Sequence, residues 1–375
     1  MKKIAFVVND SDYFISHRLF IGLALIDKGF DVYLIAPGKP PSTLIEKGFK
    51  FFSVDISRKG INPFFDLLTI FRLYILLKKI QPDLVHLVTI KPYLYGGIAA
   101  RMSGVPSVIS AVAGLGILFS GLGFKNKVLR FVLYPFYNFS FGHKNQTVIF
   151  QNTNDRDLLI RWGVLSFHKS ALIRGAGAEL KNYPFIDEPD GVPVISFAAR
   201  LLKDKGVVEF VEASRILKNQ GVGVRFWLIG EIDLGNSNSI TKEQLDIWQK
   251  AGLVECFGYR EDIANLFSQS NIVSLPSYYG EGLPKVLIEA AACGRAVITT
   301  DHPGCRDAIE PDSGMLVPVR DSVALADAIQ NLIESPVKRK AMGKAGRELA
   351  EREYSIEKIV DLHMQLYNEL ISKVL

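Results

Sequence analysis

Short apolar runs alternate with helix-like stretches from the first residues of this chain onward. In the first half the runs cover 4–8, 31–35, 84–88, 107–111 and 147–150, and helices are expected at 14–28 and 92–103. Strands that are buried on both faces have nearly continuous apolar sequences. The alternation therefore predicts an α/β fold in which a parallel sheet is covered by helices on both sides.

The alternation stops once, between residues 176 and 192, and then begins again. This segment is rich in Gly, Pro and acidic residues and has no sustained periodicity, so we expect a linker. Further strands are expected at 194–198, 224–229, 254–257, 272–275 and 296–300. The pattern predicts two doubly wound, Rossmann-like domains, 1–175 and 193–354. We expect residues 355–375 to form a helix that packs back on the first domain.

The two halves of the chain differ in charge. The 375 residues carry a net charge of +5, but residues 1–185 contain 23 Lys and Arg against 11 Asp and Glu, whereas residues 186–375 contain 21 against 28. A basic half that is rich in aromatic residues favours an anionic partner, either a phosphate-bearing acceptor or an anionic membrane surface. Nucleic acid is the weakest of the candidates because the chain contains no nucleic-acid-binding motif.

Cysteine usage and hydropathy favour a cytoplasmic location. The three cysteines form no CxxC pair, which argues against disulfides and structural zinc and favours a reducing compartment. The N-terminal apolar run is too short for a signal peptide. The most apolar stretch, 63–80, carries four charged residues, and a membrane span needs about 20 apolar ones.

Two acidic residues follow a predicted strand in the second half. Glu281 and Glu289 are eight positions apart, which on a helix is roughly 12 Å along the axis. That spacing suits one carboxylate for a sugar and another for a ribose, with a diphosphate between them. The helix N-terminus near Gly282, Leu283 and Pro284 supplies N–H groups for the phosphates. The alternative for such a pair is an ordinary solvated helix face.

Two cations occupy the equivalent place after another predicted strand. Arg200 follows the strand directly, and Lys205 precedes the next helix. Cations at this position can neutralise the charge that grows on a diphosphate leaving group. Gly230 ends the following strand and permits close approach of the backbone to a ligand. Exposed loop cations and an ordinary turn are the alternatives.

Together these segments resemble a known enzyme family. The residues that carry the resemblance are Glu281 and Glu289 in EGLPKVLIEAAACGRAVITTD, Arg200 and Lys205 in ARLLKDKG, and the FGYREDI loop around Tyr259. The chain is similar over nearly its whole length to family 4 of the retaining glycosyltransferases, which have the GT-B fold of two Rossmann-like domains facing across a cleft. It is especially similar to bacterial enzymes that extend undecaprenyl-diphosphate-linked sugars with an N-acetylhexosamine.

The resemblance implies a role for each of these residues. Arg200 and Lys205 would bind the donor diphosphate, Glu281 the donor sugar and Glu289 the ribose. The loop at Tyr259 would hold the base of a UDP-sugar. The family uses neither metal nor cofactor, and it retains the anomeric configuration of the donor. The acceptor would be a lipid-diphosphate-linked sugar, and the enzyme would act as a peripheral protein on the inner face of the cytoplasmic membrane in cell-surface glycan assembly.

The first domain is expected to hold the acceptor. The polar and glycine residues expected at this site follow its predicted strands and are Asn9, His17, Arg18, Lys91, Gly114 and Gly116. Asp10 and Asp12 form a DxD pattern, but we interpret them as helix-capping acids rather than metal ligands. The loop at 107–123 lacks the histidine that many family members have near the donor sugar, so the sequence assigns no catalytic base.

A basic aromatic stretch covers residues 119–144. It is compatible with a membrane interface beside a lipid-linked substrate, and equally with aromatic packing in the core of the first domain. The charge of the first half favours the membrane.

Three other functions are less consistent with the sequence. A sugar-nucleotide 2-epimerase on the same scaffold needs acid and base groups around C2 of the sugar, and we find no suitable carboxylate and histidine set. An inactive scaffold protein would have lost some of the donor-site residues, all of which are present. A dinucleotide dehydrogenase is not supported because the glycines do not form GxGxxG.

Overall fold

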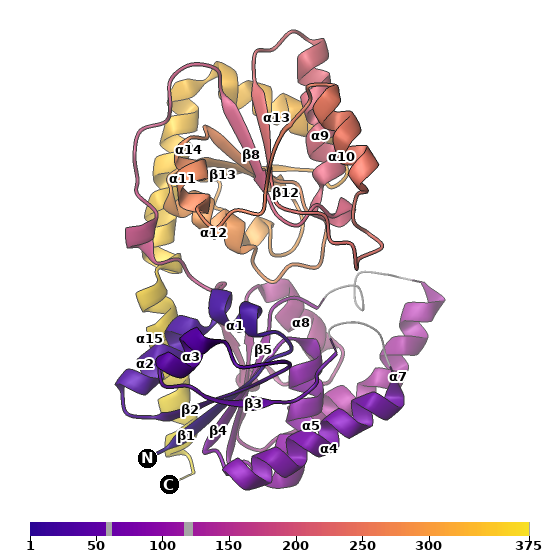
Figure 1. The fold of residues 1–375 in the computed structure, drawn as a ribbon, viewed down its shortest axis with the longest axis vertical. Coiled ribbons are helices and arrows are strands. Elements are labelled where there is room, and N and C mark those ends of the chain that lie inside the picture. Colours follow the sequence, from indigo (N-terminus) through magenta and orange to yellow (C-terminus); the bar gives the residue numbers. More distant parts are fainter. Residues whose placement is uncertain (58–61, 116–122, 375) are drawn as a thin grey trace. The chain divides into compact units, whose positions relative to one another are not determined.

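The chain divides by internal contacts into two units. In this computed structural model, which describes residues 1–57, 62–115 and 123–374, one unit consists of Met1–Ala176 with Glu357–Leu375 and the other of Gly177–Ile356 (Figure 1). We expected residues 176–192 to be a linker, but all of them except Ala176 belong to the second unit. Its Ala178 pairs in parallel with Ser355, close to the point where the chain returns to the first unit.

Among the described residues, the first unit contains a seven-stranded parallel sheet with the order β3-β2-β1-β4-β5-β6-β7. Its strands are β1 (Lys3–Val7), β2 (Asp31–Ala36), β3 (Lys50–Ser53), β4 (Leu84–Val88), β5 (Ser107–Val112), β6 (Gln146–Phe150) and β7 (Ser170–Leu172). Successive side chains point to opposite faces of a sheet. Accordingly Phe6 of β1 and His86 of β4 face one helical layer, whereas Ala5 and Val85 face the other.

Two layers of helices cover this sheet (Figure 1). One layer contains α1 (Ser11–His17), α2 (Leu19–Asp27), α3 (Ser42–Glu46) and α15 (Ile356–Ser372). The other contains α4 (Pro63–Ile80), α5 (Gly97–Ser103), α7 (Phe124–Phe141) and α8 (Thr153–Arg161), with a π-helical turn at Pro92–Gly96 and a 3₁₀ turn at Phe167–Lys169.

The second unit is built in the same way around a parallel sheet with the order β10-β9-β8-β11-β12-β13. Its strands are β8 (Val194–Ala198), β9 (Arg225–Ile229), β10 (Glu255–Gly258), β11 (Ile272–Leu275), β12 (Ala296–Thr300) and β13 (Gly314–Val317). Its helices are α9 (Val207–Asn219), α10 (Lys242–Lys250), α11 (Ile263–Ser268), α12 (Lys285–Ala292), α13 (Ser322–Glu334) and α14 (Pro336–Leu349), with short turns at Leu180–Asn182, Lys203–Lys205, Arg306–Ala308 and Ala350–Tyr354.

The last helix, α15, is held on the first unit by both apolar and polar contacts. Ile359 and Tyr367 are fully buried in the apolar layer. The carbonyl oxygen of Leu370 accepts hydrogen bonds from the Asn145 amide at 2.8 Å and the Ser107 hydroxyl at 3.3 Å. These bonds satisfy a carbonyl that the end of a helix otherwise leaves without a partner. The helix α15 therefore belongs to the first unit, although the second unit precedes it in the sequence.

A buried polar cluster lies between α15 and the sheet. His86 Nδ1 and the Tyr367 hydroxyl are 2.5 Å apart, and His363 Nδ1 lies 2.7 Å from the carbonyl of Ile359. Burial is the main cause that lowers the pKa of both histidines, that of His363 to about 3, and the nearby Arg18 guanidinium lowers both further. Both imidazoles are therefore neutral in the folded protein at neutral pH.

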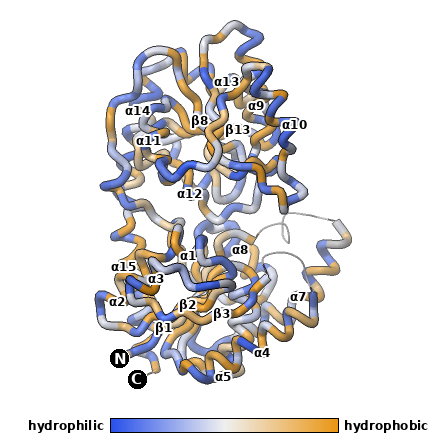
Figure 2. Tube along the Cα trace, in the orientation of Figure 1, coloured by the Kyte–Doolittle hydropathy of each residue, from blue (hydrophilic) through white to orange (hydrophobic). Residues whose placement is uncertain are grey.

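Two helices of the first unit carry apolar side chains at the surface. Figure 2 shows hydrophobic stretches along α4 and α7. Their exposed apolar and aromatic side chains are Phe64, Phe65, Leu67, Phe71 and Ile75 on α4, and Phe124, Val128, Phe131, Val132, Tyr134, Phe136 and Phe139 on α7. Tyr137 and Phe141 of α7 are buried instead, so the aromatic stretch contributes to both the core and the surface. Within the described ranges, no helix is long and apolar enough to span a membrane.

The two buried histidines should make folding stability depend on acid. The pKa of each histidine in the folded protein lies below its value of about 6.5 in the unfolded chain. At a pH between these two pKa values, the unfolded chain therefore binds more protons than the folded protein. The free energy of unfolding should decrease as pH falls below about 6.5, by up to roughly 1.4 kcal/mol per pH unit for each histidine. Urea unfolding at several pH values would measure this slope. His363→Gln should reduce it, whereas the same change at exposed His168 should not. Equal slopes in all three proteins would contradict the assignment.

Candidate functional site

The residues singled out in the second half lie beside the point where the strand order of its sheet reverses. β8 pairs with β9 on one side and with β11 on the other. Arg200 and Lys205 follow β8, and Glu281 follows β11. In open α/β sheets, ligands bind beyond the carboxyl ends of the strands at such a switch point. The topology therefore brings the predicted cations and the first predicted acid to neighbouring loops.

Lys205 and Glu281 form an ion pair in these loops. Lys205 Nζ contacts Glu281 Oε1, and the two side chains are only 14% and 11% exposed. The Ser277 hydroxyl donates to the same carboxylate oxygen at 3.2 Å, and the Lys205 ammonium lies 5.1 Å from the centre of the Tyr279 ring. Hydrogen bonds to ionised groups and a partly buried setting strengthen such a contact. A cation and an acid predicted for one site are therefore in direct contact.

Glu289 is held by two donors in the middle of α12. Its side chain is 11% exposed, and its Oε1 accepts a hydrogen bond from the Tyr183 hydroxyl at 2.7 Å. The ammonium of Lys285, one turn earlier, lies 3.2 Å away. Burial, followed by the charge of Glu289, raises the pKa of Tyr183 well above its usual range, so the phenol keeps its proton and acts as the donor. The carboxylate is thereby fixed in one orientation.

The N-terminus of α12 lies slightly later than the sequence indicated. The helix begins at Lys285 with Pro284 as the preceding cap residue, so Gly282 and Leu283 belong to the loop that enters it. Gly304 packs against this loop with a positive φ of 83°, and a Cβ there would approach the carbonyl oxygens of Glu281 and Gly282 to 2.6 Å. The loop is therefore fixed by close backbone packing.

Arg200 occupies a more open position than Lys205. Its guanidinium donates to Asp233 at 2.9 Å, and the side chain is 48% exposed. Gly230 lies next to it with φ 142°, and a Cβ at this position would come within 1.9 Å of the Ala199 carbonyl oxygen. Tyr259, after β10, is 66% exposed. The side chains of Arg200 and Tyr259 are thus accessible at the same end of the sheet.

The N-terminus of α1 confirms the capping interpretation for Asp10, whereas Asp12 lies in the first turn of the helix. Asp10 is the N-cap residue, and its carboxylate accepts from the backbone N–H of Asp12 at 3.0 Å. Asn9 lies just before this cap and is partly exposed. Within the described ranges, no group of three His, Cys, Asp or Glu side chains is arranged to hold a metal ion.

The other residues predicted for the acceptor are more scattered. His17 stacks on Tyr13 with the ring centres 4.1 Å apart, and its Nδ1 lies 2.7 Å from the Ser16 hydroxyl. Lys91 pairs with Asp66 of α4 at 3.2 Å. Gly114 follows β5 with φ 109°. Gly116 lies outside the described residues.

Arg18 differs from the expectation for an acceptor-binding residue. Its side chain is 2% exposed, and it lies close enough to His86 and His363 to lower the pKa of both imidazoles. One nitrogen donates to the backbone carbonyl of His17 at 3.0 Å. The residue ends α1 and precedes α2, where the chain enters the core. In this structure Arg18 therefore belongs to the packing beneath α15 and is not presented to a ligand.

The sequence did not predict three side chains that lie at the site. Tyr183 and Ser277 hold the two glutamates, and Tyr279 lies beside Lys205. Tyr183 is 106 positions from Glu289 and lies in the segment interpreted as a linker, so its role depends on a long-range contact. Ser277 and Tyr279 lie within four residues of Glu281, and their polar character was the one available signal.

Comparisons with known proteins match this chain to glycosyltransferases. The model of glycosyl transferases group 1 matches residues 181–349, and the glycosyl transferase 4-like model matches residues 3–152. The chain is 30% identical to the N,N'-diacetylbacillosaminyl-diphospho-undecaprenol alpha-1,3-N-acetylgalactosaminyltransferase of Campylobacter jejuni, over 95% of this chain and 96% of that one. It is 26% identical to the UDP-Gal:alpha-D-GlcNAc-diphosphoundecaprenol alpha-1,3-galactosyltransferase of Escherichia coli, over 92% and 91%.

The fold is shared with solved glycosyltransferase structures. A glycosyltransferase from Rickettsia africae superposes with a TM-score of 0.80 at 19% identity, covering 99% of this chain and 98% of that one. A likeness of this extent confirms the predicted GT-B class, in which each of two units is a Rossmann-like domain.

Gly230 should be essential for the local backbone. Replacing it with alanine places a Cβ against the Ala199 carbonyl oxygen at a φ that other residues avoid, so Gly230→Ala should destabilise the protein by about 2 kcal/mol or more. Urea unfolding monitored by circular dichroism would measure this. Gly223→Ala is the matched control, because its Cβ meets nothing within 4 Å and its φ is ordinary. Equal effects of the two changes would contradict the close approach.

Proposed function

We propose that this chain transfers a sugar from a UDP-sugar to a lipid-diphosphate-linked sugar with retention of configuration. The chain belongs to the group 1, family 4-like glycosyltransferases. Family membership makes it a glycosyltransferase. The observation that carries the proposal further is the contact between Lys205 and Glu281 at the switch point of the second sheet. It combines a cation for phosphate with an acid for sugar hydroxyls.

From this geometry we assign a residue to each part of the donor. Arg200 and Lys205 bind the diphosphate of UDP, to which two cations are suited by charge. Glu281 accepts hydrogen bonds from the sugar hydroxyls. Glu289, oriented by Tyr183, accepts from the ribose hydroxyls, and Tyr259 contacts the base. A diphosphate near Lys205 competes with Glu281 for the ammonium, so donor binding and the position of the sugar-binding acid are coupled.

The proposed chemistry needs no metal, no cofactor and no protein nucleophile. The acceptor hydroxyl attacks the anomeric carbon on the face from which the diphosphate departs. The bond between that carbon and the β-phosphate oxygen breaks, the glycosidic bond forms, and the hydroxyl proton passes to the departing phosphate. Arg200 and Lys205 stabilise the charge that grows on UDP, which is the main electrostatic demand of the step.

The proposed substrates follow the names of two relatives. One relative is named for transfer of N-acetylgalactosamine and the other for a UDP-sugar donor, and both are named for a diphospho-undecaprenol acceptor. For this chain we propose an N-acetylhexosamine such as GalNAc or GlcNAc as the donor sugar. The acceptor is an undecaprenyl-diphosphate-linked sugar in the assembly of a cell-surface glycan, such as O-antigen, capsule or a glycoprotein glycan.

The surface of the first unit supports a peripheral location on the inner face of the cytoplasmic membrane. α4 and α7 both pack on α5 and leave their apolar side chains exposed. Phe64 and Phe65 lie in the first turn of α4, and the basic Lys78 and Lys79 lie in its last turn. Apolar side chains combined with cations suit the boundary of an anionic membrane, where the rings enter the acyl region and the cations meet the headgroups.

Variants of the donor site should separate binding from turnover. Arg200→Ala removes a charge-assisted contact and should weaken UDP binding about tenfold. Glu281→Gln should lower kcat by about a hundredfold, because a neutral amide accepts more weakly from the sugar hydroxyls in the transition state. Calorimetry with UDP and GDP, and turnover with UDP-GalNAc and UDP-GlcNAc, would measure both effects. Arg215→Ala on the surface of α9 is the control. Wild-type behaviour of both site variants, or a preference for GDP, would refute the donor assignment.

Exposed aromatic residues of α4 should determine vesicle binding. Changing both Phe64 and Phe65 to serine removes apolar surface that is 74% and 62% exposed, and should reduce partitioning onto anionic vesicles by about tenfold. Co-sedimentation would measure the bound fraction. Leu234→Ser changes a residue of the second unit that is 95% exposed and should have no effect. Unchanged sedimentation of the double variant would show that these α4 residues do not contribute to membrane binding.

A further inference from the structure

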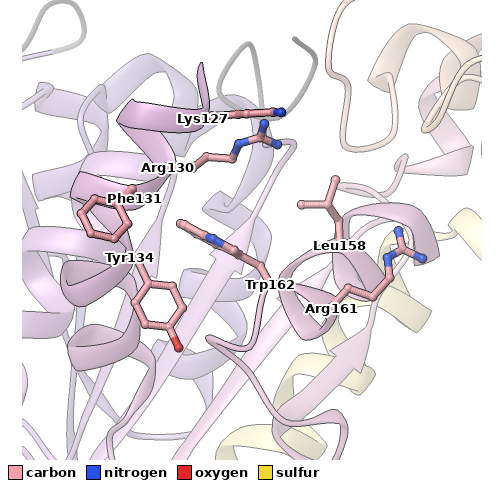
Figure 3. Close-up of a pocket in the computed structure, with 7 residues that line it drawn as sticks. All are labelled: Lys127, Arg130, Phe131, Tyr134, Leu158, Arg161 and Trp162. Carbon is pink, nitrogen blue, oxygen red and sulfur yellow. The ribbon is translucent and has the colours of Figure 1, made fainter. Parts of the chain in front are cut away.

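A second polar feature of the first unit lies between α7 and α8. Residues of these helices, together with Trp162 at the end of α8, line an open pocket of about 440 Å³ (Figure 3). Three cations line it, which are Lys127, Arg130 and Arg161, and three aromatic side chains, which are Phe131, Tyr134 and Trp162. In Figure 3 the Trp162 ring lies between the α7 residues and those of α8. None of these residues has a role in the donor site.

The pocket is positively charged. Among the described lining residues there is no carboxylate, and Lys127 and Arg161 form no ion pair within the described part of the chain. Arg130 donates through Nε to the backbone carbonyl of Asn126 at 3.2 Å, which leaves its terminal nitrogens for another acceptor. The neighbouring acid of α8, Asp157, pairs with Arg156. The pocket therefore suits an anion.

The sequence around α7 also excludes negative charge. From residue 84 to residue 154 the chain contains no Asp or Glu, while it contains six Lys and Arg. A surface arranged only for solubility usually mixes both signs of charge. The absence of acids from these residues therefore points to an anionic ligand, because carboxylates nearby would repel one.

One wall of the pocket is rigid and aromatic. The ring of Trp162 meets the rings of Tyr137 and Tyr134 edge to face, with centres 5.0 and 5.7 Å apart. Tyr137 is fully buried, so it anchors the stack to the core, whereas Phe131 is 82% exposed beside the pocket. Fixed aromatic rings bind apolar chains with little loss of side-chain entropy. Cations and an aromatic wall together suit a ligand with an anionic head and an apolar chain.

We propose that this pocket binds the diphosphate of the lipid-linked acceptor, with the first isoprene units of the lipid against Phe131 and Trp162. The inference rests on the proposed function, because it assigns a place to part of the acceptor. Arg130 contributes planar donors for phosphate oxygens, and Lys127, one turn away on the same helix, adds a mobile charge. The pocket continues the exposed apolar surface of α7, from which a membrane lipid can enter.

Titration with a soluble prenyl diphosphate would test the assignment. Trp162 is one of three tryptophans in the chain, and the other two, Trp227 and Trp248, lie in the second unit. Farnesyl diphosphate should change the fluorescence of the whole protein, and Trp162→Phe should abolish the change. Farnesol and inorganic pyrophosphate, which each lack one half of the ligand, should bind at least about tenfold more weakly. Equal binding of farnesol would overturn the role of the cations.

Charge reversal gives the sharper comparison. Arg130→Glu should weaken binding of farnesyl diphosphate by at least about tenfold, because it removes a charge-assisted contact and adds repulsion. Lys144→Glu makes the same charge change at an exposed position outside the pocket and should bind like the wild type. Equal weakening in both variants, or in neither, would overturn the proposal. Competition by phosphatidylglycerol vesicles as strong as that by farnesyl diphosphate would also overturn it, since the pocket would then select any anionic lipid.

The same preparations distinguish this inference from the proposed function. UDP binding and sugar transfer to a prenyl-diphosphate-linked sugar would be measured in parallel. Transfer that proceeds normally while Arg130→Glu leaves farnesyl diphosphate binding unchanged would refute the pocket alone. Specific binding of farnesyl diphosphate in the pocket, with no transfer from any nucleotide-sugar, would refute the proposed function and leave the pocket standing.

Discussion

The contact between Lys205 and Glu281 is the interaction on which the rest of the second unit's site depends. Two oppositely charged side chains with little exposure contact each other where the order of strands reverses. Removing a charge from water is costly unless a partner compensates. Each member of the pair therefore compensates the other, with support from Ser277, at the place where we propose that the donor binds. Close backbone packing by Gly304 fixes the loop that carries the acid.

The two units contain similar sheets. The strand order of both reverses next to their first strands, β1 and β8, so polar loops lie at equivalent places. Charge distinguishes them. The first unit combines basic residues with exposed aromatic side chains on α4 and α7, whereas the second is the acidic part of the chain. This separation is consistent with a lipid-linked anion on one unit and a hydroxyl-rich nucleotide-sugar on the other.

The alternation of apolar runs was enough to predict most of the fold. The central strands β1, β4, β5, β8, β11 and β12 lie where continuous apolar runs indicated them. The strands that were not predicted, β3, β7 and β13, lie at the edges of the two sheets and are shorter or less buried. The helix expected at 14–28 is divided at Arg18 into α1 and α2. Helix propensity alone does not predict this break. The break occurs at Arg18, whose buried guanidinium belongs to a cluster formed with α15, and such a long-range contact is not visible in the local sequence.

By itself the sequence determined the class of fold, the family, and the residues proposed for the donor, because apolar periodicity and short motifs are local properties of the chain. Tertiary structure decided which of those residues meet. It joined Lys205 to Glu281 across 76 positions and Tyr183 to Glu289 across 106, and it buried Arg18. It also brought the cations of α7 and α8 to one pocket. Such contacts depend on how strands are ordered in the sheet and on how helices cover it, and no short segment of the sequence encodes either.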